Sequence, residues 1–294
     1  MKRFIIFCIS VLLLISFITS VYAADTGAIK SGDKVVIKDE NWAYEKINNT
    51  YGYEIDEYIG SGVDVSLPYS FAKQYVTSIG SYAFNRKNVK TVETTYKIER
   101  IGEYAFNGCV ELESVNLYDS ITSLGVGCFY GDTALKNVNL QATSVNFVPA
   151  YCFADCGIEK IRLPKTCTSI KNYAFYNCGS LKYVTIPESV TEIADNAFYG
   201  CGNNLVIVCN KDSYAVQYAQ SKGINYILLG DSNDDGKFNI RDATAIQYYK
   251  IGQMELTDYG KICADVDHNG KINVRDVTYI QMKIAKMELP EDCF

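Results

Sequence analysis

The sequence LKYVTIPESVTEIADNAF, residues 181–198, is the clearest copy of a unit that recurs through the middle of the chain. Each copy ends on a Phe that follows Ala or Cys and stands five residues after an aliphatic residue. The spacings between successive copies are 22, 23, 24, 22 and 23 residues. A fixed period of this length predicts stacked supersecondary units that bury their apolar faces against one another. The repeated residues are Phe84, Phe106, Phe129, Phe153, Phe175 and Phe198.

A short apolar-polar run of the form L-x-x-V-x-L follows most of these Phe residues. Because successive side chains of a strand point to opposite faces, this form predicts a strand with three side chains inward and two outward. Pro164 and Pro187 follow two of the runs, as suits strands that end at turns. The runs are 112–117, 135–140, 158–163 and 181–186.

These units resemble the BspA-type leucine-rich repeat family, whose units read L-x-x-V-x-I-P-x-S-V-T-x-I-G-x-x-A-F-x-x-C. Residues 181–193 match best, and the third and fourth units, with Gln141-Ala142-Thr143 and Val148-Pro149, depart most. The resemblance covers residues 63–229 and implies an α/β solenoid of short parallel strands joined by short helices or turns. We expect residues 24–62, which contain Trp42, to cap the first repeat with short strands, and a strand at 205–208 with a helix at 213–222 to cap the last.

The last sixty-odd residues contain a second duplication, in two twelve-residue segments that begin at Asp231 and Asp265. Each segment places side-chain oxygens at positions 1, 3, 5, 9 and 12 and Gly at position 6, and the carbonyl of position 7 completes the set. This is the spacing by which a loop binds a hard cation, so we expect two calcium ions. The expected ligands are Asp231, Asn233, Asp235, Lys237, Asn239 and Asp242 in one loop, and Asp265, Asp267, Asn269, Lys271, Asn273 and Asp276 in the other.

Both loops continue into similar helix starts, at 242–247 and 276–281. Gly230 and Cys263-Ala264 leave little room for entering helices, so we expect each unit to be a loop with its exiting helix only. This arrangement resembles the type I dockerin family, and we assign residues 230–294 to such a small all-α domain. The resemblance implies calcium binding and a cohesin module of a cellulosome scaffold as the partner.

The resemblance also implies which residues contact cohesin, through loop positions 10 and 11 and helix positions 17 and 18. The Ser-Thr pair that is familiar at positions 10 and 11 is absent here, and an aliphatic residue followed by Arg replaces it. We therefore expect cohesins that require Ser-Thr to be rejected, and the duplication allows docking in two orientations. The residues are Ile240, Arg241, Gln247 and Tyr248, and Val274, Arg275, Gln281 and Met282.

Residues 1–23 have the basic, apolar and small-residue order of a signal peptide, which predicts cleavage after Ala23 and export. A membrane anchor is the alternative, but the apolar run 4–18 is short for a span and no second candidate follows. The net charge of -6 argues against a nucleic-acid partner. Most of the eleven Cys recur at fixed points of the repeat, which favours buried free thiols, although oxidation of neighbouring pairs remains open.

Two rows of side chains are candidate binding surfaces on the repeats. A Tyr row, Tyr82, Tyr104, Tyr151 and Tyr173, lies two residues before the repeated Phe, where packing is the expectation and contact with sugar rings the alternative. The outward strand positions form a polar row, either a solvated face or a binding surface. Its members are Thr91, Glu93, Ser114, Asn116, Asn137, Asn139, Lys160, Arg162, Tyr183 and Thr185.

No enzyme is indicated by the sequence. His268, the single His, stands at loop position 4, so no Ser-His-Asp or Cys-His arrangement can form around it. A carboxylate pair remains open, but a leucine-rich stack predicts no deep cleft to hold one. We therefore expect a secreted, non-catalytic binding protein, anchored by a dockerin, whose repeats bind a protein or cell-surface ligand. The alternatives are a carbohydrate-binding module and an unrecognised glycoside hydrolase.

Overall fold

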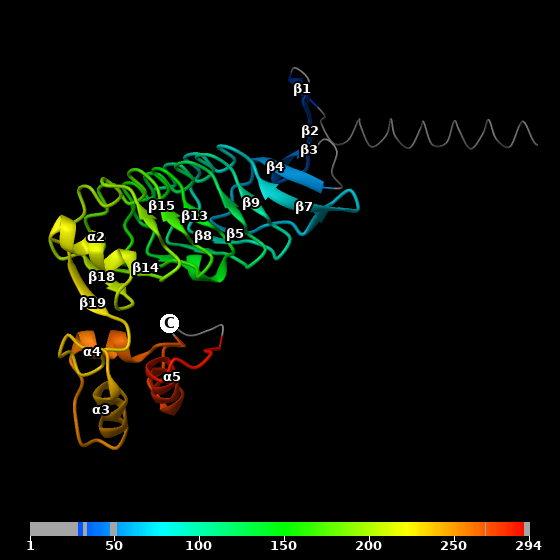
Figure 1. Ribbon diagram of the computed structural model, residues 1–294. Helices are drawn as coiled ribbons and strands as arrows, with labels where there is room; N and C mark the ends of the chain where they lie inside the picture. Colours follow the sequence, from blue (N-terminus) through cyan, green and yellow to red (C-terminus); the bar gives the residue numbers. More distant parts are fainter. Residues whose placement is uncertain (1–28, 32–33, 48–51, 268, 291–294) are drawn as a thin grey trace, which may run out of the picture.

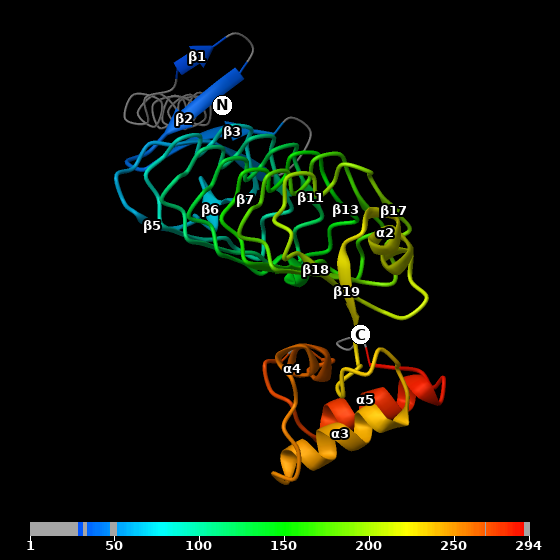
Figure 2. The same ribbon diagram turned by 90° about the vertical axis from the view of Figure 1, so that its left-hand side faces the viewer.

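The computed structural model describes residues 29–31, 34–47, 52–267 and 269–290. The predicted signal peptide, residues 1–23, and His268 lie outside these ranges. A long solenoid of stacked repeats occupies the middle of the chain, and a small helical module lies beneath its C-terminal end, beside β19 (Figures 1 and 2). None of the helices in the described residues combines the length and the apolar run that crossing a bilayer requires.

The L-x-x-V-x-L runs form the sheet face predicted from the sequence. Their strands pair in parallel, in the orders β12-β10-β8-β5 and β14-β16-β18-β19. Both outward residues of each three-residue strand are at least partly exposed, and the central residue is buried. The strands are β5 (Asp64–Ser66), β8 (Thr91–Glu93), β10 (Ser114–Asn116), β12 (Asn137–Val138), β14 (Lys160–Arg162), β16 (Tyr183–Ile186), β18 (Val206–Cys209) and β19 (Asn225–Leu228).

Each repeat contributes a second strand, of two residues in all but the first, that the sequence analysis did not identify. These strands end on the aliphatic residue five positions before the repeated Phe, and they pair in parallel on the opposite side of the solenoid. Turns connect the two sides, and in residues 63–209 the sole helical turn is η1 (Leu140–Ala142). The second strands are β7 (Gln74–Ile79), β9 (Arg100–Ile101), β11 (Ser123–Leu124), β13 (Phe147–Val148), β15 (Ser169–Ile170) and β17 (Glu192–Ile193).

The repeated Phe residues stack into one buried column along the solenoid axis. Neighbouring ring centroids lie 4.8 to 5.5 Å apart, and most ring planes are within 10° of parallel. Trp42 covers the first ring of the column, with its centroid 5.9 Å from that of Phe84. Tyr218 covers the last, 6.1 Å from Phe198. The period of the sequence therefore places one ring per repeat at the centre of the core.

The buried cysteines add a second ladder beside the Phe column. The thiol of Cys109 donates to the carbonyl of Phe84 over 2.9 Å, and the thiols of Cys156 and Cys178 bond the Phe carbonyl of the preceding repeat in the same way. All nine cysteines in the described residues are free, and eight of them are buried. The thiols of Cys109, Cys156 and Cys178 thus each satisfy a buried backbone acceptor.

Strands and a helix close the two ends of the solenoid. At the N-terminal end, an antiparallel β1-β2-β3-β4 sheet joins the repeats through β7, which also pairs with the short β6. At the C-terminal end, α2 (Tyr214–Lys222) precedes the last strand, β19, which leads directly into the helical module. The remaining N-terminal strands are β1 (Ile29–Ser31), β2 (Lys34–Lys38), β3 (Trp42–Lys46), β4 (Gly52–Tyr58) and β6 (Ser70–Phe71).

The helical module contains α3 (Ile240–Lys250), α4 (Asp258–Ala264) and α5 (Val274–Ile284). The expectation that neither loop has an entering helix is wrong for the second loop, because α4 ends one residue before Asp265. Thr257 caps this helix by accepting a hydrogen bond from the amide of Gly260. The first loop has no such helix, since β19 ends two residues before Gly230.

Candidate calcium loops and repeat groove

The second loop brings three carboxylates together. Ligand atoms of Asp265, Asp267 and Asp276 all lie within 4.8 Å of one another. One oxygen of Asp265 is buried without a hydrogen-bond partner, and the buried Oδ2 of Asp267 makes no hydrogen bond but faces Arg275 Nε at 3.3 Å. Gly270 donates its amide to the other oxygen of Asp265 over 2.9 Å, which fixes the turn at loop position 6. Orphaned carboxylate oxygens in such a group fit a hard divalent cation.

Burial and mutual repulsion act on the acids of this loop. Burial, together with the nearby Asp276 and Asp267, raises the pKa of Asp265 to about 6. Burial also raises the pKa of Asp276, again with a contribution from Asp267. Both causes disfavour the charged form, and a bound cation would offset both.

The first loop is similar, but its acids are less closely gathered. Asp231 and Asp242 are buried, and burial raises the pKa of Asp242 to about 6. Asp231 accepts from the amides of Asp235 and Gly236, over 3.2 and 2.8 Å. Asp235 is exposed, and its carboxylate accepts from the side-chain amide of Asn233 over 3.2 Å. Among the described residues, the close three-acid arrangement occurs in the second loop alone.

Loop positions 9 and 12 also start the exiting helices, a role that the sequence analysis missed. Asn239 caps α3 by accepting from the amide of Arg241 over 3.0 Å, and Asp242 accepts from the amide of Asn239 over 2.7 Å. Asn273 and Asp276 form the same capping box at α5. The Asn residue that begins a helix and the Asp three residues later were the signal that could have revealed it.

The module packs on the solenoid through a shared apolar core. Val208 and Leu229 from the end of the solenoid belong to the same buried cluster as Ile246, Val266 and Ile280 of the module. Across the same junction, Lys283 Nζ lies 3.1 Å from Glu188 Oε2, and the rings of Tyr183 and Tyr259 meet edge to face at 6.4 Å. The absence of a flexible linker in the sequence is thus matched by direct packing.

The residues expected to contact cohesin are mostly exposed. Ile240 is 54% exposed and Val274 is 74% exposed, at the starts of α3 and α5. Arg241, Gln247, Tyr248 and Gln281 are also exposed, whereas Met282 packs partly against the module core. Arg275 differs from Arg241, because its Nε donates to the Tyr279 hydroxyl over 2.6 Å and lies 3.3 Å from Asp267. The two sets are alike but not equivalent.

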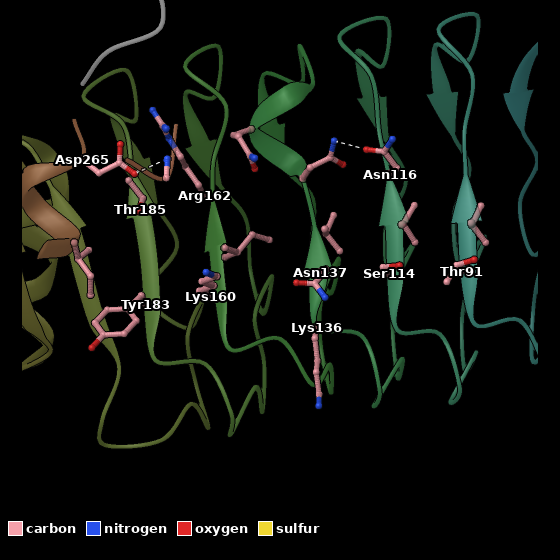
Figure 3. Close-up of a pocket in the computed structure, with 18 of the residues that line it drawn as sticks. Thr91, Ser114, Asn116, Lys136, Asn137, Lys160, Arg162, Tyr183, Thr185 and Asp265 are labelled. Atoms are coloured by element: carbon pink, nitrogen blue, oxygen red, sulfur yellow. Dashed lines mark hydrogen bonds between the residues drawn. The ribbon is translucent and has the colours of Figure 1, made fainter. Parts of the chain in front are cut away.

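A groove of about 870 Å³ runs along the sheet face and ends at the module (Figure 3). The outward residues of β8 to β16 form its floor, and Lys261, Ile262, Asp265 and Gly270 of the module form one end. Along one row, Asn139 donates to Asn116 over 2.7 Å, and Asn116 donates to Glu93 over 2.7 Å. The polar row predicted from the sequence is therefore the floor of a cavity.

The Tyr row lies at turns on the other side of the repeats, and its members take left-handed backbone angles. Tyr82 stacks on Tyr104 with centroids 5.4 Å apart, and Tyr151 stacks on Tyr173 at 5.1 Å. Gly127 replaces Tyr in the third unit, where φ is +60°, and Tyr130 fills the gap at 6.4 Å from Tyr104. Because each stacked ring covers a face of its neighbour, this arrangement favours packing over contact with sugars.

The family model of the BspA type leucine rich repeat region matches residues 64–148 and 146–222 with six copies, more than half of the chain. The chain belongs to this family. The model of the dockerin type I domain matches residues 229–285 of this BspA-type repeat protein. Dockerin domains of this type bind calcium and imply a cohesin partner. A search of curated proteins found no match.

Solved leucine-rich repeat proteins are similar to this BspA-type protein. One from Bacteroides ovatus is 27% identical with a TM-score of 0.50, over 58% of this chain and 46% of that protein. A leucine rich repeat protein from T. pallidum is 25% identical with a TM-score of 0.41, over 57% of this chain and 68% of that one. The chain thus spans less than half the length of the Bacteroides protein.

Proposed function

We propose that this protein is a non-catalytic adaptor: a calcium-loaded dockerin anchors it to a cohesin, and the repeat groove presents a binding surface to a further ligand. The observation that supports the proposal is that the module packs on the solenoid with one side and leaves another side exposed. One side packs on the solenoid through Val208 and Leu229, and the residues expected to meet cohesin remain exposed. The module can therefore dock without leaving the repeats.

Calcium, when bound, would neutralise the acids of each loop and hold positions 1 to 12 in one ring. The protein's own residues then set the docking surface. Asn239 and Asn273 fix where α3 and α5 begin, so that the aliphatic residue and the Arg that follow them project from the first helical turn. Two calcium sites, one per loop, are part of the proposal.

The docking test uses Ile240→Asp and Val274→Asp in the full chain. Both residues stand at the first position of a helix, where Asp is compatible with the helix dipole, so the fold should be retained. Each single variant should bind cohesin within about threefold of wild type, because the other set remains usable, and the double variant should lose at least about a hundredfold. Val110→Asp, at a 54% exposed position on the repeats, is the matched control.

Surface plasmon resonance against immobilised type I cohesin modules gives the readout. A double variant no weaker than the worse single variant would mean that a single set is used and would remove the two-orientation proposal. Loss of binding in Val110→Asp would place the docking surface elsewhere.

The alternatives receive less support from the groove. Tyr183 is the one aromatic residue in its lining, so the groove has little surface on which sugar rings could stack. Its two acids, Glu93 and Asp265, come from β8 and from the module at opposite ends, so they do not form the pair that glycoside hydrolysis needs. Release of reducing sugar from polysaccharide by the purified chain would establish the hydrolase instead.

Export is the remaining part of the proposal. It rests on residues 1–23, and it predicts a mature N-terminus at Ala24. Peptide sequencing of the protein recovered from culture medium tests this, and an intact Met1 there would contradict it.

A further inference from the structure

The groove is rich in cationic side chains from its middle to the module. Lys136 precedes β12, Lys160 and Arg162 belong to β14 (Figure 3), and Lys261 belongs to α4 of the module. The remaining charged residues of the lining are Glu93, at the far end, and Asp265, an expected calcium ligand. This local excess of positive charge contrasts with the net charge of -6 for the whole chain.

Two of these cations have no partner among the residues that the structure describes. Lys136 and Lys160 are exposed, and neither makes an ion pair or side-chain hydrogen bond with any described residue. Lys261 reaches Glu255 only at 4.0 Å, and both of these side chains are open to solvent. Unpaired cations gathered in one concave site attract an anionic ligand.

We propose that the groove binds an acidic peptide segment of a partner protein in extended conformation, with its carboxylates at Lys136, Lys160 and Arg162. This deepens the proposed function by specifying the chemistry of the repeat ligand, and it rests on that function. Strands about 4.8 Å apart give the floor from β8 to β16 a length of about 19 Å, which matches an extended segment of about six residues. Ser114 of β10 and Asn137 of β12 are paired in the sheet, and both offer uncharged polar groups to the backbone of the peptide.

A peptide fits this groove better than a glycan. Neutral glycans depend on aromatic faces, and the single Tyr of the lining already has its ring against Tyr259. A row of hydroxyl, amide and ammonium groups at successive strands instead suits the alternating carbonyls and carboxylates of an acidic strand.

The second calcium loop should control the strength of this site. Arg162 and Asp265 lie near each other in the lining at the module end of the groove (Figure 3). Without a cation, the carboxylates of the loop therefore compete for Arg162 with any acidic ligand. Calcium neutralises most of their charge, which leaves Arg162 available, so calcium should strengthen peptide binding.

The experiment measures fluorescence anisotropy of labelled (Glu-Ser)5 and (Gln-Ser)5 with the full chain, in calcium and in EDTA. We expect (Glu-Ser)5 to bind in calcium and (Gln-Ser)5 to bind at least about tenfold more weakly. The variant Lys136→Gln/Lys160→Gln should weaken (Glu-Ser)5 about tenfold, and Lys211→Gln/Lys250→Gln, at exposed positions outside the groove, should not. EDTA should weaken the binding of (Glu-Ser)5 to wild type more than its binding to the Arg162→Gln variant.

Equal binding of the two peptides would overturn the inference. A second contradicting result would be no binding of (Glu-Ser)5 together with polygalacturonate binding that the groove variants weaken, because the groove would then bind an acidic glycan. Cohesin binding is measured on the same samples. If it persists while (Glu-Ser)5 fails, the groove inference is wrong and the adaptor function stands. If (Glu-Ser)5 binds while every cohesin fails, the adaptor function is wrong.

Discussion

At the scale of single residues, one repeat has an acidic residue at a buried position that Cys occupies in other repeats. Asp132 stands three residues after Phe129, where four other repeats have Cys. It is fully buried, and one of its oxygens accepts from the amide of Cys109 over 2.8 Å. The other oxygen of Asp132 has no hydrogen-bond partner. In other repeats the Cys thiol at this position donates to a Phe carbonyl, and an ionised carboxylate cannot do so. Burial raises the pKa of Asp132 well above its usual range.

This raised pKa predicts a pH-dependent stability. The stability that neutral Asp132 gives the fold is fully present below the unfolded pKa of about 3.9, and it is lost as pH rises toward and through the raised folded value. Asp132→Asn keeps the acceptor oxygen and cannot ionise. Its advantage over wild type in melting temperature should therefore grow from pH 5 to pH 8, equivalent to about 1–3 kcal/mol at pH 8. An advantage that is the same at both pH values would show that Asp132 does not ionise differently in the folded and unfolded states.

The calcium loops make a second prediction at this scale. Asp231 is buried at loop position 1, whereas Asp234 is exposed and accepts from the Thr257 hydroxyl over 3.0 Å. Asp231→Ala should weaken the calcium affinity of one of the two sites by at least about tenfold. Asp234→Asn, which keeps the acceptor and tolerates the left-handed φ of 57°, should change it by less than about threefold. Equal losses in calorimetric titrations would mean that the loop register is wrong.

At the scale of elements, the period of the sequence predicted the main strands and their outward residues. It did not predict the second strand of each repeat, because most of these strands have two residues, too few to show an alternating pattern. Helix α4 was missed because it has seven residues, includes Gly260 and depends on the tertiary packing of its C-terminal residues. Short elements of this kind are set by their neighbours.

The Phe column is the element whose loss should cost most. Phe129 stacks between Phe106 and Phe153 at 5.3 Å on each side and is fully buried. Phe129→Ala should lower the free energy of unfolding by about 3–5 kcal/mol, because it leaves a cavity in the middle of the stack. Phe147→Ala, at a 36% exposed position of the next repeat, should cost less than about 1 kcal/mol. Similar losses for both variants in urea unfolding would contradict the role of the column.

At the scale of the whole molecule, the sequence predicted the floor of the groove but not its end at the module. The polar row could be read from the repeats, but its closed end depends on how Val208 and Leu229 pack against the module, which no local pattern encodes. The same packing joins the calcium loops to the repeats. Calcium at about a thousand times its dissociation constant would stabilise the module by roughly 4 kcal/mol per site.

Removal of calcium should therefore affect the two parts unequally. EDTA should reduce the helical circular dichroism of α3, α4 and α5 in the full chain, because three acids per loop then repel one another without a counter-ion. The solenoid should keep its separate thermal transition, since its core of Phe and Leu side chains does not use the ion. A helical signal that EDTA leaves unchanged would contradict calcium-dependent folding of the module.

The central claim is that the repeats are carried to a scaffold by a calcium-dependent dockerin. Its most direct test is surface plasmon resonance of the full chain over type I cohesin modules from the scaffold proteins of the same organism, in calcium and in EDTA. The account predicts saturable binding to at least one cohesin in calcium and its loss in EDTA. Binding to none of them in calcium, or binding that EDTA leaves unchanged, would contradict it.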